Sequence, residues 1–369
     1  MDPALHNLVD RVREAATHKT PLRIRGGASK DFYGQELQGE ILDTREFTGI
    51  VSYEPSELVV TVRCGTPLAE LEATLAQSGQ CLAFEPPHFS VAGTTTCGGM
   101  VASGLSGPSR ANAGAVRDHV LGLTLLNGRA NLLSFGGQVM KNVAGYDVSR
   151  LMAGAWGTLG VITEVSLKVL PFAAAQATLV FELDQARALA QLHRWGAQPL
   201  PLNASCWVQD EGKERLFVRL RGAAAAVEAA CGKMLLEHTG QRLDEAVAQP
   251  DWQDCRDQRL PFFAQAPAPD LGLWRLSVAQ TAPALDLPWP QLVEWHGAQR
   301  WLWAPAHAAQ ALHEAAQRAC GHATLFRVPI SASEPLPRTA PLTEPLARIH
   351  RQLKAEFDPS AIFNPGRFG

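Results

Sequence analysis

Residues 93–108 read GTTTCGGMVASGLSGP, a stretch with five glycines and three consecutive threonines but no charged side chain. Because glycine has no Cβ, such a stretch packs little surface of its own and lets another group lie directly against its backbone. Two more glycine-rich segments occupy residues 25–30 (RGGASK) and 154–160 (GAWGTLG), each beside an apolar strand pattern. Any one of them alone is explained by tight turns. Together they predict a large phosphate-bearing cofactor held by several loops, because successive backbone N–H groups can converge on an anion.

The usual single-loop phosphate motifs are absent from the sequence. No GxGxxG occurs between a strand and a helix, and Glu214 and Met234 follow the two Gly-Lys pairs where a P-loop requires a hydroxyl residue. The GxSxG turn of hydrolases is also missing. A zinc-protease helix is excluded because Gln317 stands where the second histidine would follow His313 and Glu314.

The composition is that of a soluble globular protein, with 46% hydrophobic and 19% charged residues over 369 positions, a length that favours two domains. The formal net charge of −3 gives no electrostatic reason to expect nucleic acid as a partner. No apolar run reaches the ~20 residues that cross a bilayer, so no membrane span is expected. Seven cysteines without a CxxC pair argue against a disulfide framework, a zinc site or an iron–sulfur cluster in this chain. We therefore expect a cytoplasmic protein.

The periodicity of apolar residues predicts an α+β fold in three parts. Residues 1–172 alternate helical and strand patterns, including a helix over 66–79 and a hairpin at Asn127-Gly128. Residues 173–330 contain two successive halves, of which the first has a β-α-β-β-α pattern, and predict a roughly ferredoxin-like cap domain with an antiparallel sheet backed by helices. Residues 331–369 form a proline-rich connector, a final helix and a short tail.

Five segments of the first part, read in order, resemble a known family: RGGASKDFYG, VRCGTPLAELEATLAQSGQ, EPPHFSVAGTTTCGGMVASGLSGPSR, GAVRDHVLGLTLLNG and KNVAGYDVSRLMAGAWGTLGVITEVSLKVLP. This order is similar to the FAD-binding domain of the vanillyl-alcohol oxidase type, the PCMH-type fold. The closing FDPSAIFNPGR resembles its glycolate oxidase and D-lactate dehydrogenase branch, and with GHATLFR the chain resembles the FAD-binding E subunits (GlcE) of bacterial glycolate oxidase. The KNVAGYD and FNPGR segments make the UDP-N-acetylmuramate reductase branch a weaker alternative.

The resemblance implies two α+β subdomains that hold an FAD, with residues 331–369 returning to complete the flavin site. It implies that the following residues bind the cofactor: Gly26, Gly27, Ala28, Ser29, Lys30, Gly93, Thr94, Thr95, Gly98, Gly99, Gly104, Gly157, Thr158, Leu159, Gly160, Val161 and Asn364. The RGGASK loop has no histidine where relatives attach FAD covalently, so we expect non-covalent binding. Cys97 is interpreted as a small buried residue rather than a flavin-bonded thiol. Arg117 and Asp118 match a family pair that is either structural or cofactor-binding.

The catalytic residues stay unknown at this level. Relatives that oxidise hydroxy acids place an arginine and a threonine before the GYD motif to hold the substrate carboxylate. Here Met140 and Ala144 stand in that run, which leaves Lys141 as a weak candidate. Those relatives also carry a metal-binding motif in the second domain, where this chain offers His322 without a carboxylate, so no metal is expected.

His296 and His322 are the other weak candidates, as a base or as an anchor for a carboxylate. The alternative reading of the region around His296 is a hairpin of the cap domain whose tryptophans, Trp301 and Trp303, fill the core or a partner interface. Arg300 and Arg327 are further polar candidates in the same part of the chain.

The resemblance implies an FAD-binding subunit that works in a complex oxidising glycolate to glyoxylate, with D-lactate as a second substrate. Its partners would be a homologous catalytic flavoprotein (the D subunit, GlcD-like) and an iron–sulfur protein (the F subunit, GlcF-like) that receives the electrons. Two alternatives stay open: a stand-alone FAD-dependent 2-hydroxy-acid dehydrogenase, and a non-catalytic assembly subunit. The complex could associate peripherally with the inner membrane.

Overall fold

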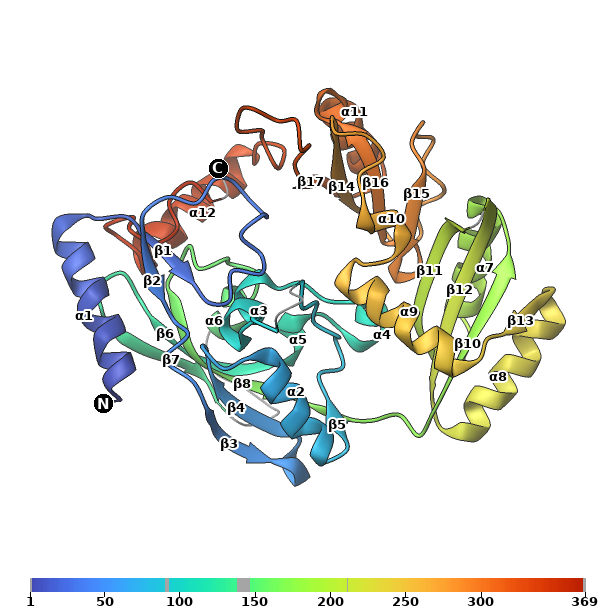
Figure 1. Ribbon diagram of the computed structural model, residues 1–369, viewed down its shortest axis with the longest axis horizontal. Helices are drawn as coiled ribbons and strands as arrows, with labels where there is room; N and C mark the ends of the chain where they lie inside the picture. Colours follow the sequence, from blue (N-terminus) through green and yellow to red (C-terminus); the bar gives the residue numbers. More distant parts are fainter. Residues whose placement is uncertain (1, 90–92, 138–146, 211, 368–369) are drawn as a thin grey trace. The chain divides into compact units, whose positions relative to one another are not determined.

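The computed structural model describes residues 2–89, 93–137, 147–210 and 212–367. The chain divides into two compact units, shown in Figure 1. The first contains residues 1–106, 114–172 and 341–369, and the second contains residues 107–113 and 173–340. Each unit combines helices with a mainly antiparallel sheet, which confirms the α+β class expected from the sequence.

A five-stranded antiparallel sheet forms the centre of the first unit. Its strands are ordered β3 (Ile50–Glu54), β4 (Val59–Arg63), β8 (Val161–Lys168), β6 (Val120–Leu126) and β7 (Leu132–Gly136). Helices α2 (Leu68–Gln77) and α3 (Cys97–Ser103) pack against this sheet. Leu68, Leu71 and Leu75 recur at helical spacing and are fully buried, so the periodicity that predicted α2 also supplies its packing face.

The predicted hairpin exists, but its connection is longer than a two-residue turn. Residues 127–131 join β6 to β7, and the amide of Asn127 donates to the carbonyl of Asn131 (3.0 Å). The side-chain oxygen of Asn127 accepts from the amides of Arg129 and Asn131, at 3.0 and 2.9 Å. The asparagine therefore closes the loop through its side chain, an Asx-type turn.

A second core of the first unit brings distant segments together. It joins α1 (Pro3–His18), the parallel strand pair β1 (Leu22–Arg25) and β2 (Glu40–Asp43), and the C-terminal tail. Phe363 is fully buried there and forms a parallel bridge with Leu22 of β1. The remaining elements of this unit are short: η1 (Pro55–Glu57), β5 (Gln80–Cys81), α5 (Val116–His119), α6 (Val148–Met152) and β9 (Leu170–Pro171).

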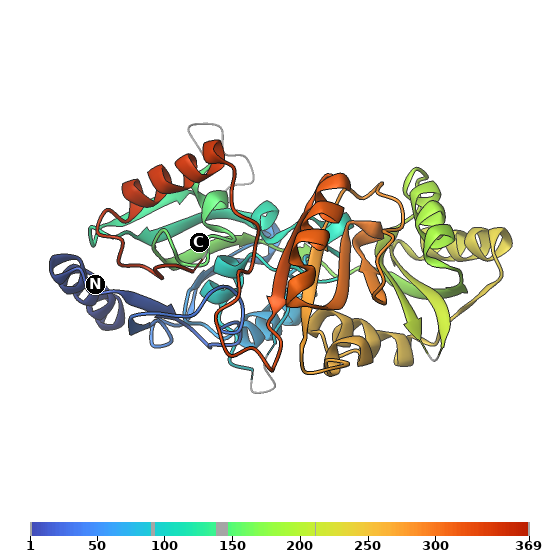
Figure 2. The same ribbon diagram turned by 90° about the horizontal axis from the view of Figure 1, so that it is seen from above.

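The tail is held in place by the end of α12 (Glu344–Phe357), which lies along β6 and β7 in Figure 2. Asp358 follows this helix, and its buried carboxylate accepts from the amides of Ile362 (3.1 Å) and Phe363 (2.8 Å) and from Lys354 Nζ (2.7 Å). Lys354 also donates to the carbonyls of Thr158 and Phe363. These bonds fix the tail beside β1.

The second unit contains one continuous eight-stranded antiparallel sheet. Its strands are ordered β13 (Gly240–Arg242), β10 (Ala175–Glu182), β12 (Lys213–Gly222), β11 (Leu202–Asp210), β15 (Gln291–Glu294), β16 (Gln299–Pro305), β14 (Leu271–Ser277) and β17 (His322–Arg327). The two predicted halves meet where β11 pairs with β15. The second half has no helix between its first two strands, because residues 278–290 contain three prolines.

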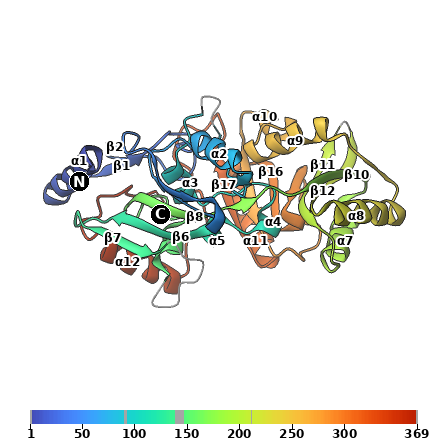
Figure 3. The same cartoon turned by 90° about the horizontal axis from the view of Figure 1, so that it is seen from below.

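Helices cover both faces of this sheet, as Figure 3 shows. One face of the sheet packs against α7 (Gln185–Gly196), α8 (Ala224–Glu237) and α11 (Ala309–Arg318). The other face packs against α9 (Glu245–Asp257) and α10 (Pro261–Ala264). Alternation along β16 follows this division, since Leu302 packs with α11 whereas Trp301 and Trp303 contact α10. The shorter helices are α4 (Arg110–Ala113), η2 (Trp295–Gly297) and η3 (Ala306–Ala308).

Candidate functional site

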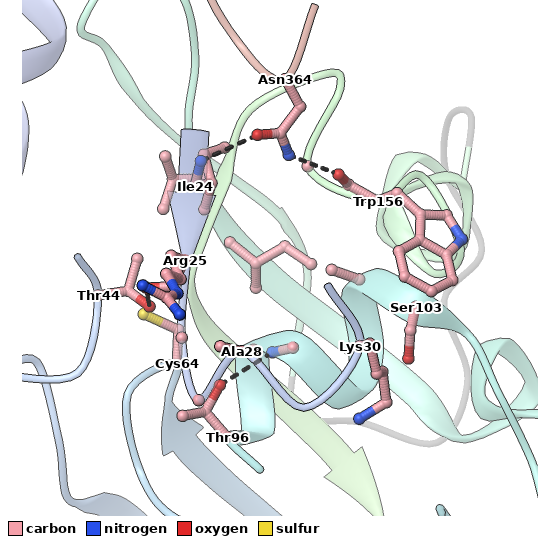
Figure 4. Close-up of a pocket in the computed structure, with 18 of the residues that line it drawn as sticks. Ile24, Arg25, Ala28, Lys30, Thr44, Cys64, Thr96, Ser103, Trp156 and Asn364 are labelled. Carbon is pink, nitrogen blue, oxygen red and sulfur yellow. Dashed lines mark hydrogen bonds between the residues drawn. The ribbon is translucent and has the colours of Figure 1, made fainter. Parts of the chain in front are cut away.

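A pocket opens in the first unit where β1, α3, the start of β8 and the C-terminal tail converge (Figure 4). Its space, counted together with the opening to solvent, is about 770 Å³. Its lining residues are Ile24, Arg25, Gly26, Gly27, Ala28, Ser29, Lys30, Asp31, Leu37, Thr44, Cys64, Thr96, Gly98, Gly99, Ala102, Ser103, Trp156, Gly157, Gly160, Val161, Ile162, Asn364 and Arg367.

The loop after β1 forms the first wall and packs directly on the segment that precedes α3. A Cβ on Gly27 would lie 1.4 Å from the carbonyl oxygen of Thr94, and one on Gly26 would lie 2.3 Å from Thr96 Oγ1. Thr94 Oγ1 donates to the carbonyl of Gly27, and Thr95 Oγ1 donates to Ser29 Oγ, both at 3.0 Å. Glycine is therefore required at positions 26 and 27 by the contact between the two loops.

Amides of the same loop are available to an anion. Within the described part of the chain, the amides of Gly27, Ala28 and Ser29 donate no hydrogen bond to another residue. Ala28 has a left-handed backbone (φ 58°), and a change of backbone hand among successive residues turns their N–H groups into one concavity. This arrangement fits a diphosphate group, which needs several converging donors.

Cationic side chains add positive charge to this wall. Lys30 is buried, and its Nζ lies 3.2 Å from Ser29 Oγ. Arg367 of the tail is also buried and donates through Nη2 to the carbonyl of Lys30 (3.2 Å). Arg25 is paired with Asp31, with 3.4 Å between Nε and Oδ2, so the net positive charge comes from Lys30 and Arg367. Charge of this sign in a partly enclosed site favours an anionic ligand.

The opposite end of the pocket is built around Asn364. Its Oδ1 accepts from the amide of Ile24 (2.9 Å), and its Nδ2 donates to the carbonyl of Trp156 (2.7 Å), as the dashed lines in Figure 4 show. Trp156 has a left-handed backbone (φ 54°), and its ring stacks on Tyr33 with 4.6 Å between the ring centroids. Asn364 therefore joins β1 to the turn that leads into β8.

Eleven of the seventeen residues expected from the sequence line this pocket. They are Gly26, Gly27, Ala28, Ser29, Lys30, Gly98, Gly99, Gly157, Gly160, Val161 and Asn364. The other six lie outside the lining: Gly93, Thr94, Thr95, Gly104, Thr158 and Leu159. Thr94 and Thr95 bond to the first wall instead, and Gly104 ends α3 with φ 63°.

Several lining residues were not expected from the sequence. Thr96 accepts from the amide of Gly99 (3.2 Å) as the N-cap of α3, a role that a threonine before a helix could have indicated. Arg367 had no such signal, because only the folded tail brings it to the pocket, whereas Trp156 lies inside the expected 154–160 segment but had no role predicted for its side chain. Cys97 lies in the core under α3, where burial raises the pKa of its thiol, and Asp118 caps α5 by accepting from the amide of Ala115 (2.8 Å).

Comparison with known proteins decides the family. A family profile described as an FAD binding domain matches residues 6–136. The chain is 46% identical over 360 residues to glycolate oxidase subunit GlcE of Escherichia coli (strain K12), an alignment that covers 98% of this chain and 96% of that protein. The chain belongs to the GlcE family.

More distant similarities extend beyond the GlcE family. Glycolate oxidase subunit GlcD of Bacillus subtilis (strain 168) is 29% identical over 176 residues, 47% of this chain and 37% of that protein. The structure of 4-ethylphenol oxidase from Gulosibacter chungangensis superposes with a TM-score of 0.69 at 12% identity, covering 98% of this chain and 87% of that one. The expected PCMH-type FAD-binding fold is confirmed, and FAD is the cofactor of this family.

Neither His296 nor His322 is among the described residues that line the pocket of the first unit. Lys141 falls outside the described residues. His322 begins β17 in the second unit, where it is exposed and pairs with Ser277 of β14. Arg300 is fully buried and donates to the carbonyls of Ala282 (2.9 Å), Pro283 (2.8 Å) and Gly297 (3.1 Å), so it holds the proline-rich connection. Arg327 donates to Gln258 Oε1 (2.7 Å) within the same unit.

His296 is buried in the second unit with a left-handed backbone (φ 55°). Asn112 Nδ2 lies 2.6 Å from its Nε2 and also donates to the carbonyl of Asn203, so Nε2 accepts and Nδ1 carries the proton. Nδ1 has no hydrogen-bond partner in the described residues. Burial, together with the nearby His193, lowers the pKa of His296 from 6.5 to about 4, so the imidazole is neutral at physiological pH.

This depressed pKa predicts that the second unit becomes less stable on acidification. In the unfolded state His296 binds a proton below pH 6.5, whereas in the folded state it binds one only near pH 4. The free energy of unfolding therefore decreases as the pH falls from 6.5 to 4. The loss attributable to this group between pH 7 and pH 5 is about 2 kcal/mol. Urea unfolding at the two pH values measures it. His296→Asn should remove this part of the pH dependence, whereas His307→Asn, at an exposed position of the same unit, should leave it in place.

No helix within the described ranges of the chain is long and apolar enough to cross a membrane.

Proposed function

We propose that this chain is the FAD-binding subunit of a glycolate oxidase complex that oxidises glycolate to glyoxylate. The observation that carries the proposal is the 46% identity to a glycolate oxidase subunit over nearly the full length of both chains. The pocket in the first unit supports it, because backbone amides without a partner and buried cationic side chains suit the diphosphate of a dinucleotide. The glycines at positions 26 and 27 allow the two loops of this wall to pack together.

In this proposal the chain holds FAD without a covalent bond. The loop over residues 26–30 and Arg367 would bind the diphosphate, and the segment from Gly157 to Val161 would run along the rest of the cofactor. The lining thiol, Cys64, is buried, and burial raises its pKa to about 12. A thiol that stays protonated is a poor nucleophile, which favours non-covalent binding.

When bound, the isoalloxazine supplies two-electron oxidation of a CH–OH group. The residues of this chain would position the cofactor and keep it from solvent. A base and a carboxylate anchor are also needed, and Lys141, His296 and His322 stay weak candidates for them. His296 is neutral, but its Nε2 is engaged by Asn112 and its protonated Nδ1 is buried, which counts against it as a base.

We further propose that a GlcD-like flavoprotein and a GlcF-like iron–sulfur protein complete the complex. The second of these would receive the electrons. The assembly would be cytoplasmic, with peripheral association at the inner membrane, and D-lactate would be a second substrate.

The anaerobic visible spectrum of the purified chain, recorded before and after addition of glycolate, tests the proposal. We expect flavin bands that persist with glycolate alone and bleach once the partner subunits are added. Bleaching by glycolate without partners would instead identify a stand-alone dehydrogenase. A chain without flavin bands, even after incubation with FAD, would contradict the proposal and identify an assembly subunit.

A further inference from the structure

A polar row crosses one face of the sheet of the second unit, near the end of three strands. β14, β16 and β17 lie side by side there (Figure 1), and Ser277 of β14 is opposite both Gln299 of β16 and His322 of β17. Residues opposite each other on neighbouring strands point to the same face of a sheet. The row runs from the buried Gln299 through the half-buried Ser277 to the exposed His322, so it reaches solvent at β17.

Arg275 lies next to this row on the same face. Residues two apart on a strand share a face, whereas Trp274 and Leu276 point to the opposite one, into the core under α11. The guanidinium carbon of Arg275 lies 5.7 Å from the ring centroid of Phe326, and that ring packs edge-on against Trp301. The buried aromatic part of this face therefore borders the half-buried Arg275, where its polar part begins.

Arg275 and His322 place a cation beside an imidazole on adjacent strands. Partial desolvation and the neighbouring Arg275 lower the pKa of His322, so the imidazole is neutral at physiological pH. An anion bound between the two side chains would offset the charge of the arginine and raise that pKa. Arginine also suits a carboxylate in particular, because its planar guanidinium can donate two parallel hydrogen bonds to the two oxygens.

The buried end of the row has an acceptor without a donor. Gln299 Nε2 donates to the carboxylate of Glu294 (3.1 Å), whereas Gln299 Oε1 is buried and accepts a hydrogen bond from no described residue. A buried polar atom without a partner is costly, so its presence points to a group that binds there. A ligand hydroxyl would supply the missing donor.

We propose that this face binds a small 2-hydroxy carboxylate, with the carboxylate on Arg275 and the hydroxyl at Gln299. Ser277 and His322 would flank the ligand. Arg275 and Gln299 are diagonal neighbours on adjacent strands, a separation of about 7–8 Å that two long side chains and a small ligand can span. The inference rests on the proposed function, because glycolate belongs to this class of ligand and its oxidation needs a carboxylate anchor.

Isothermal titration of the FAD-loaded chain with glycolate, under anaerobic conditions, tests the site. Arg275→Gln should weaken glycolate binding ~10-fold or more, because hydrogen bonds from a charged group are lost. Arg275→Lys keeps the charge but not the planar fork, so it should recover only part of the affinity. Arg318→Gln removes an exposed arginine of α11 in the same unit and should leave binding unchanged. The FAD content and circular dichroism of each variant show whether its fold is intact.

Two further probes separate this site from a general anion site. Acetate lacks the hydroxyl and should bind roughly 3–10-fold more weakly than glycolate, a preference that Gln299→Met should abolish. In histidine NMR spectra, with the His322 signal assigned by its loss in His322→Gln, glycolate should raise the pKa of His322. The same concentration of glycolate should have much less effect on that pKa in Arg275→Gln.

Equal affinity of the unchanged chain and Arg275→Gln for glycolate would overturn the site. So would acetate or inorganic phosphate that binds as tightly as glycolate, or an FAD-loaded chain that binds no glycolate. These results would leave the FAD-binding role of the chain in place. A chain that binds glycolate through Arg275 but takes up no FAD would instead contradict the proposed function and support the site.

Discussion

Replacing Gly27 by alanine is expected to remove FAD from the protein. The added Cβ would lie 1.4 Å from the carbonyl oxygen of Thr94, a backbone atom that no side-chain rotation can move away. The loop over residues 26–30 must then separate from the segment before α3, which also breaks the bond from Thr94 Oγ1 to the carbonyl of Gly27. Overpacking of this kind costs roughly 1–3 kcal/mol or more, so FAD affinity should fall at least ~10–100-fold.

Flavin absorbance per protein and titration of the apoprotein with FAD measure this effect. Gly232→Ala is the matched control, because a Cβ at that helical position meets nothing within 4 Å. The control should bind FAD normally and gain up to ~1 kcal/mol in stability from the better helix former. If the Gly27 variant kept full affinity, the loop over residues 26–30 would not be the diphosphate wall.

The glycine-rich segments predicted the location of the pocket from the sequence because glycine is informative where backbones approach closely. The reason for the glycines was only partly predictable. Their expected role was to admit a cofactor to the backbone, whereas at positions 26 and 27 the space of the missing Cβ is filled by residues 94–96. Sequence alone could not show this, because it depends on how two loops almost 70 residues apart meet.

The hydrogen bonds that the tail makes around the pocket were beyond prediction, although Asn364 itself was expected at the site. Trp156 adopts a left-handed backbone that disfavours bulky residues, and it is held by a hydrogen bond from Asn364, which is over 200 residues away. In the second unit, the strands were evident from their alternation. The burial of Arg300 in a carbonyl cage was not, since a charged residue in a strand is normally read as solvent-exposed.

The largest effect expected from a tail residue is at Asn364. Its amide satisfies both the N–H of Ile24 and the carbonyl of Trp156, so Asn364→Gly leaves two backbone groups unpaired while keeping the left-handed backbone (φ 40°) unstrained. Each unsatisfied group costs about 1–3 kcal/mol. The first unit should therefore lose roughly 2–5 kcal/mol of unfolding free energy, measured by urea denaturation, and bind FAD more than tenfold more weakly.

Asn364→Asp keeps one of the two hydrogen bonds of the side-chain amide and removes the other. The carboxylate still accepts from Ile24, but it sets a second negative oxygen against the carbonyl of Trp156, where a donor is required. Protonation restores a donor, and burial next to a carbonyl raises the pKa of such a carboxyl above its ordinary ~3.9. FAD affinity of the Asp variant, relative to the unchanged protein at the same pH, should thus rise as the pH falls from 7 towards 5. A ratio that stays constant would show that the bond to Trp156 does not hold the pocket together, and that the bond to Ile24 alone joins the tail to β1.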